Sequence, residues 1–253
     1  MQKREKRILE YFLKNKKILE RLLRQDRPSV VRIHKMRVAV RRLRAVIWMK
    51  RQEVDLPALR YGDQSLKKLA KALGPTRELQ VALVDAREMR MDTVGLREKL
   101  SKAITKSMVY LHSPRQIGLL MERLERLQRA LEVTSVSRAR KVNRRLRKDV
   151  NKAFKNTTRD IHPLRICVKR VRYCFEAEGL QTGGLADLQG TLGEIHDLEV
   201  LQRFVGTKKV IKNRVRKLRG QALRQAPKVL RFLRKEVLKA RSLKQAPLRS
   251  HGD

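Results

Sequence analysis

The sequence predicts an all-α protein, and three observations support this prediction. Apolar residues recur at intervals near 3.6 along almost the whole chain, without any useful stretch that alternates with a period of two. Glycine and proline interrupt this pattern at intervals that suit helices of ordinary length. Several motifs also occur twice in the same order, so we expect two helical bundles that arose by tandem duplication.

The first half of the chain is expected to form about six helices. Breaks are predicted before Pro28, in a connector between Pro57 and Gly62, and at Gly74, where a helix-ending glycine precedes a proline. The expected helices cover roughly residues 8–23, 28–51, 65–73, 75–91, 96–111 and 114–133.

The second half is expected to repeat this plan with about six more helices. They begin near residues 137, 162, 185, 194, 207 and 227, with breaks at Gly193 and at Pro227. The junction near residues 131–136 contains no long Gly/Ser/Pro-rich linker. We therefore expect two repeats, residues 1–132 and 133–253, that pack together as one domain about a pseudo-twofold axis.

One basic stretch, His34 to Arg44, carries the functional signal. At about 100° per residue on a helix, its cations gather on one quarter of the circumference and its apolar residues on the opposite side. The same pattern of basic residues recurs 128 residues later, from His162 to Arg172. The matching residues of the two copies are His34, Arg37, Arg41, Arg42 and Arg44, and then His162, Arg165, Lys169, Arg170 and Arg172.

The net charge of the chain predicts a polyanionic partner. The 64 Lys and Arg residues against 25 Asp and Glu give a formal charge of +39, which destabilises a compact protein unless polyanions neutralise it. Nucleic acid, an acidic membrane surface and a phosphate polymer all fit this charge. A hydrophobic content of 41% argues against a disordered basic tail.

The cellular setting is expected to be cytoplasmic, with no membrane partner. No apolar run approaches the 18 residues of a transmembrane helix, and the first residues lack the apolar core of a signal peptide. Cys167 and Cys174 are seven residues apart on one expected helix, about 10 Å along its axis, which is too far for a disulfide. Both are expected to be core thiols in a reduced environment.

A single basic helix face is usually a solvated surface, but the duplication favours a binding site here. We expect these faces to lack acidic partners one turn away, and two duplicated rows can face each other across a groove. Each row spans about 15 Å, so the pair can line a path for an extended chain of phosphates. The planar fork of arginine suits phosphate oxygens, lysine adds a point charge, and histidine can donate a hydrogen bond.

With these motifs, the chain resembles the CHAD family, the "conserved histidine α-helical domain". The resemblance rests on the paired His-x-x-Arg patterns, on Tyr173 after the second pattern, and on two Leu-Gly elements that lead to Glu78 and Asp197. It covers nearly the whole chain and implies two pseudo-twofold-related helical bundles that bind inorganic polyphosphate along a basic central path. It assigns the ten matching residues of the two copies to polyphosphate binding. Association with polyphosphate granules is one of the purposes of this binding that the sequence leaves open.

A few residues depart from the family pattern or have an open role. Glu78 and Gln80 stand where the family more often has Asp, and Pro163 directly follows the second histidine. None of these changes touches the two rows of cations. For Glu78 and Asp197, capping of a helix start and orientation of a nearby arginine are both open.

Three other functions are compatible with a basic helical protein: catalysis, metal binding and nucleic-acid binding. No catalytic residues and no cofactor are expected, because the chain shows no Gly-rich phosphate loop, no Gly-x-Ser-x-Gly motif and no acidic β-rich segment. No metal is expected, because the His and Cys spacing is not that of a zinc site, and His196 is expected to be a capping, surface or tail residue. Nucleic acid is the main alternative partner, as a weak or non-specific ligand, although aromatic residues for base stacking are few.

Overall fold

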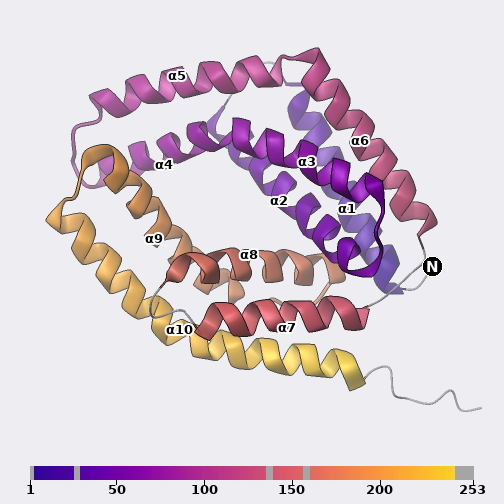
Figure 1. The fold of residues 1–253 in the computed structure, drawn as a ribbon. Helices are drawn as coiled ribbons and strands as arrows, with labels where there is room; N and C mark the ends of the chain where they lie inside the picture. The colour runs from indigo at the N-terminus through magenta and orange to yellow at the C-terminus, as the bar shows by residue number, and fades with distance from the viewer. Residues whose placement is uncertain (1–2, 26–28, 135–138, 156–159, 243–253) are drawn as a thin grey trace, which may run out of the picture.

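The computed structural model describes residues 3–25, 29–134, 139–155 and 160–242, and these form ten helices without a strand. The prediction of an all-α protein is confirmed. Figure 1 shows α5 and α6 along one edge of the molecule and α10 along the opposite edge. The helices are α1 (Lys3–Leu23), α2 (Val30–Glu53), α3 (Pro57–Ala72), α4 (Gly74–Glu88), α5 (Val94–Leu111), α6 (Pro114–Val133), α7 (Ala139–Lys155), α8 (Ile161–Glu178), α9 (Leu185–Val205) and α10 (Lys209–Ser242).

The two basic stretches lie on α2 and α8, and both helices have side-chain N-caps. Ser29 accepts a hydrogen bond from the backbone N–H of Arg32, and Asp160 accepts one from the backbone N–H of His162. Such caps satisfy N–H groups that the first helical turn leaves without partners. The expected start at Pro28 lies outside the described residues.

The apolar side of α2 is buried, as its spacing predicts. Met36, Val40 and Leu43 are at most 1% exposed, and Ala39, Val46 and Ile47 are buried beside them. Each fully buried large apolar side chain contributes about 1.5–3 kcal/mol relative to an exposed one. This packing fixes the rotation of α2, and the cations are therefore held on its other face.

The contacts between the halves are compatible with a pseudo-twofold arrangement, which stays a prediction. The helix α2 packs against its counterpart α8, and α4 packs against α9. The helix that precedes each basic helix also crosses over, so that α1 contacts α8 and α7 contacts α2. The boundary between residues 132 and 133 stays a prediction, since α6 ends at Val133 and residues 135–138 lie outside the described part.

The predicted connector between Pro57 and Gly62 is wrong, because these residues form the first turns of α3. Gly62 permits close packing of two helices instead of breaking one. A Cβ atom at Gly62 would lie 3.0 Å from Cδ2 of Leu127 on α6 and 3.7 Å from Cδ1 of Ile47 on α2. The missing side chain therefore brings α3 close to α6.

Two expected breaks in the second half are also wrong, so four helices stand where about six were predicted. The helix α9 continues through Gly193, because the next residue, Glu194, has a backbone N–H that can donate within the helix, whereas Gly74 is followed by a proline, which has none. The helix α10 continues through Pro227. Ser113 caps the start of α6, but the matching Ala226 has no side-chain acceptor for a new helix start. Figure 1 shows α10 bent, as an internal proline favours.

Candidate functional site

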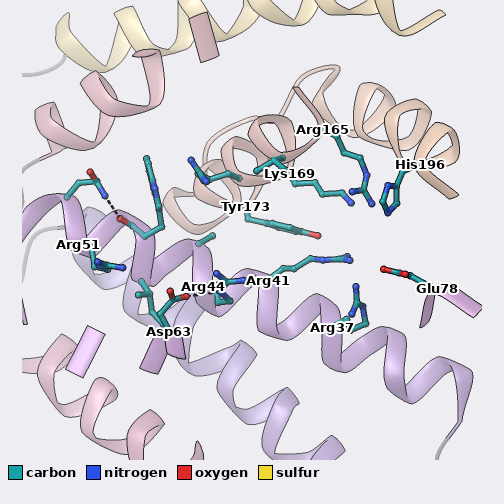
Figure 2. A pocket seen from close by; sticks show the side chains of 16 residues that line it. Arg37, Arg41, Arg44, Arg51, Asp63, Glu78, Arg165, Lys169, Tyr173 and His196 are labelled. Atoms are coloured by element: carbon teal, nitrogen blue, oxygen red, sulfur yellow. Dashed lines mark hydrogen bonds and ion pairs between the residues drawn. The ribbon is translucent and has the colours of Figure 1, made fainter. Parts of the chain in front are cut away.

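The two basic rows face each other across a cavity between α2 and α8. Arg37 and Arg41 extend from α2 toward Arg165 and Lys169 of α8, as Figure 2 shows. The opposite faces of both helices are committed to the core, where Leu43 and Val168 are at most 1% exposed. Burial of the apolar sides thus turns both rows toward the same space.

This space consists of two adjoining cavities with a shared lining. The larger one has a volume of about 680 Å³ and the smaller one about 400 Å³. Both are lined by Arg37, Arg41, Arg165 and Lys169, which we call the central cations, together with Glu78 and His196. The central cations therefore stand at the middle of a path that runs through both cavities.

None of the central cations forms a direct ion pair with a carboxylate of the described chain. The Arg37 Nη1 atom donates a hydrogen bond to the carbonyl oxygen of Ala70 at 3.2 Å. The Nε atoms of Arg37 and Arg165 are buried and have no hydrogen-bond partner among the described residues. These guanidinium groups retain donors that could bind an anion.

Burial, together with neighbouring positive charge, lowers the pKa values of three of the central cations. Burial, followed by the charges of Arg165 and Arg41, lowers the pKa of Lys169 to about 7. Burial and the charge of Arg41 lower the pKa of Arg37 to about 10, and burial lowers that of Arg165. Each lowered pKa means that the protonated form is less favourable here than in water, so a bound anion would relieve this cost.

Two further predicted residues line only the larger cavity, and each has an acidic partner. The Arg44 Nε atom lies 2.7 Å from Oδ1 of Asp63, and the Arg170 Nη1 atom lies 2.7 Å from Oδ2 of Asp149. The guanidinium group of Arg170 also stands over the Trp48 ring, 5.2 Å from its centroid. These two arginines are oriented by the fold and extend the basic lining beyond the central cations.

Arg42 and Arg172 do not line either cavity. Both lie beside Glu176, with the Arg42 Nε atom 3.4 Å from Oε2 and the Arg172 Nε atom 2.9 Å from Oε1. The expectation that acidic partners one turn away are absent is wrong for Arg172, because Glu176 is four residues further along α8. The hydroxyl group of Tyr11 also donates to Glu176, so this group joins α1, α2 and α8.

The two motif histidines occupy different surroundings. His34 lines the smaller cavity, and its pKa is lowered by burial and by the charges of Arg77, Arg41 and Arg37. His162 lines a separate recess of about 60 Å³ together with Arg165 and His196. The ring centroids of His162 and His196 are 6.2 Å apart.

Arg77 of α4 and His196 of α9 also belong to the site, although sequence reasoning did not assign them to it. His196 lines both cavities, and burial with the charges of Arg165 and Lys169 lowers its pKa to about 4. His196 lies within α9 and is partly buried at the cavities, so it is neither a helix cap nor a tail residue. The two residues occupy the same position in the repeated Leu-Gly elements, directly before Glu78 and Asp197, and this repetition was the available signal.

Carboxylates reach the smaller cavity from α4 and α9. Burial raises the pKa of Asp197 even though Arg165, Lys169 and Arg77 oppose this shift, and burial with the charge of Asp197 raises the pKa of Asp85 to about 6. Helix-start capping does not describe Asp197, which lies within α9. Glu78 points toward the path in Figure 2 and lies 3.6 Å from Nη2 of Arg203.

Cys167 and Cys174 are buried free thiols, which confirms their assignment to the core, and burial raises the pKa of Cys167 to about 12. Within the described ranges, no three His, Cys, Asp or Glu side chains gather where they could hold a metal ion. None of the described helices combines the length and apolar character needed to cross a membrane.

A family model and one solved structure name the same family. A family model described as CHAD domain matches residues 8–206. The crystal structure of the CHAD domain from the plant Ricinus communis has a TM-score of 0.64 and 23% identity, over 96% of this chain and 88% of that chain. PptA from Streptomyces chartreusis has a TM-score of 0.52 and 14% identity, over 93% of this chain and 99% of that chain.

No match was found among curated proteins. At these identities the two solved structures show a shared fold alone. The family model, in contrast, covers most of the chain and includes both basic rows. The chain therefore belongs to the CHAD domain family.

Proposed function

We propose that this protein binds inorganic polyphosphate along the path between α2 and α8. The observation that carries the proposal is the arrangement of the central cations, which are partly buried, face one another and form no direct ion pair with described carboxylates. A linear chain of phosphates supplies one negative charge per unit and offers oxygens on every side. It can therefore contact both rows at once.

The electrostatics of the path favour a polyanion over a single small anion. The pKa values of Lys169, Arg37, Arg165 and Arg77 are all lowered, mainly by burial. One phosphate can relieve this cost only beside the few groups that it touches. A polymer that passes through both cavities would reach all of them, and Arg44 and Arg170 would extend its contacts at the larger cavity.

The ten predicted residues are divided by their surroundings into groups with different proposed roles. The central cations hold the polymer, His34 and Arg77 contact it at the smaller cavity, and His162 acts through His196. Arg42 and Arg172 support the fold through Glu176. From this division we infer a function in binding, without catalytic chemistry. The cellular role that we propose is association with polyphosphate granules.

A competition experiment tests the choice of polymer. Long-chain polyphosphate should displace the protein from duplex DNA and from tRNA of equal phosphate content at physiological salt. Nucleic acid presents its charges on the outside of a wide helix or folded chain, whereas the path admits a narrow chain between two helices. If nucleic acid wins this competition, the preferred ligand is nucleic acid and the proposal is wrong.

A thermal-shift experiment tests the location of the site. Polyphosphate should raise the melting temperature, because a ligand of the native state stabilises it by mass action. Replacement of the central cations Arg37, Arg41, Arg165 and Lys169 by Ala should remove most of this shift. The matched control replaces three exposed arginines and one exposed lysine, removing the same charge, at Arg87, Arg97, Arg115 and Lys102. Equal shifts in the two variants would place the binding elsewhere.

A further inference from the structure

The two cavities differ in the character of their linings. The larger cavity contains an apolar and aromatic region formed by Trp48, Ile166 and Tyr173, with Gln52 beside it. Among the described residues that line the smaller cavity, only Val81 and two glycines are apolar, and all the others are polar or charged. An inorganic phosphate chain has no apolar part, so it gives no reason for an aromatic group at one end of its path.

This group is accessible and held in place. Ile166 is 45% exposed although it is a large apolar residue, and Trp48 is partly buried at the same cavity. Arg170 stands over the Trp48 ring and is itself fixed by Asp149. The Gln52 Nε2 atom donates to the backbone carbonyl oxygen of Trp48 at 3.1 Å, which holds the Gln52 side chain one turn further along α2.

The spacing of the two regions matches a ligand with an aromatic part and a phosphate part. Arg41 and Trp48 are seven residues apart on α2, which is about 10 Å along the helix axis. An extended nucleoside triphosphate separates its base from its outer phosphates by a similar length. The cavity volume of about 680 Å³ also lies within the range of small-molecule sites.

We propose that the larger cavity is a binding site for nucleoside polyphosphates, with the phosphates at the central cations and the base at Trp48 and Ile166. This proposal rests on the proposed phosphate path for one half of the ligand and adds a site for the other half. Stacking of a base on an aromatic ring tolerates any base, because every base has a π face. Nucleotides would then compete with the end of a polyphosphate chain for the same cations.

The test compares ATP with two ligands that lack a base, tripolyphosphate and methyl triphosphate, by titration calorimetry without divalent ions. Methyl triphosphate carries the same ionisable oxygens as ATP, and tripolyphosphate carries one more. Charge alone would therefore make ATP bind no tighter than either of them. We expect ATP to bind about tenfold more tightly than methyl triphosphate, because base stacking on an aromatic side chain contributes on this order.

Variants locate this advantage at the aromatic group. Trp48→Leu should remove the advantage of ATP and leave the affinity for tripolyphosphate unchanged. Ile166→Ala changes an exposed side chain with little risk to the fold and should reduce the same advantage. Tyr61→Leu is the matched control, because Tyr61 carries Arg123 over its ring at 5.4 Å but lies outside both cavities. This control should keep the full advantage.

A spectroscopic measurement provides a second readout in the unmodified protein. Trp48 is the single tryptophan of the chain, so selectively excited tryptophan fluorescence reports on this cavity. ATP should change this fluorescence with a saturable dependence that matches calorimetry.

Two results would overturn the proposal, and they are distinguishable. If the ligands without a base bind but ATP binds no more tightly, the nucleotide site is wrong and the phosphate path stands. If none of the three binds but long-chain polyphosphate still raises the melting temperature, the nucleotide site is wrong and the phosphate path stands; both proposals fail only if long-chain polyphosphate also does not bind.

Discussion

Proton uptake at Lys169 gives a quantitative test of the phosphate path. Burial beside Arg165 and Arg41 lowers the pKa of Lys169 from its ordinary 10.5 to about 7. Bound phosphate places negative charge next to the amine and raises this pKa again. Binding must therefore take up a proton at every pH at which the free protein holds Lys169 neutral.

The magnitude follows from the two protonation states. With a pKa of about 7, Lys169 in the free protein is about half protonated at pH 7 and about 1% protonated at pH 9. If phosphate binds only the protonated form, the affinity falls up to about 50-fold between these values. The folding stability of the free protein has the opposite pH dependence. Between the folded-state pKa of about 7 and the ordinary pKa of 10.5, Lys169 binds more protons in the unfolded chain than in the folded one, so stability without ligand rises with pH over this range.

The assay is titration calorimetry with long-chain polyphosphate in two buffers of different ionisation enthalpy. At pH 8.5 the difference in observed enthalpy should correspond to about one proton taken up per site. In the free protein, His34 and His196 are neutral at this pH because their pKa values are lowered, so neither residue has a proton to release when the ligand binds. Long chains are used so that their terminal phosphates contribute negligibly.

Lys169→Arg is the decisive variant, because its guanidinium group stays charged across this range. It should bind polyphosphate with little pH dependence and without proton uptake at pH 8.5. An affinity of the natural protein that stays constant from pH 7 to pH 9 would refute the reasoning. The same holds if Lys169→Arg keeps the full pH dependence.

Three further predictions concern the division between binding and fold. Arg42→Ala and Arg172→Ala should each lower the free energy of unfolding by about 1 kcal/mol, because each loses a contact with Glu176; urea unfolding measures this loss. Both variants should keep the thermal shift that polyphosphate induces, and loss of that shift would place the two arginines in the binding site. Removing Arg41 and Arg165 together should reduce the slope of log affinity against log salt by about 1.5, from fluorescence titrations at several salt concentrations, since each phosphate contact contributes about 0.7–0.9. An unchanged slope would mean that these two arginines do not contact phosphate. Leu43→Ala should destabilise the fold by about 2–5 kcal/mol, because Leu43 is fully buried, while calorimetry at low temperature finds an unchanged affinity in the folded protein.

Much of the helical plan follows from local sequence. Apolar spacing predicted the helices, and Ser113 and Gly74 marked two real helix starts. The errors at Gly62, Gly193 and Pro227 share one cause. A glycine or proline interrupts a helix only if capping and packing favour a new start, and the neighbours in space decide this.

The sequence by itself determined the two basic rows and their repetition, because spacing along a helix fixes which residues share a face. Only the tertiary structure decided which cations remain without ion pairs. Arg44 pairs with Asp63, which is 19 residues away in the sequence, and Arg170 pairs with Asp149, which is 21 residues away. Arg42 pairs with Glu176, which is 134 residues away. Burial and the mutual approach of α2 and α8 likewise set the pKa of Lys169. These are long-range properties of the folded chain, and helical periodicity does not encode them.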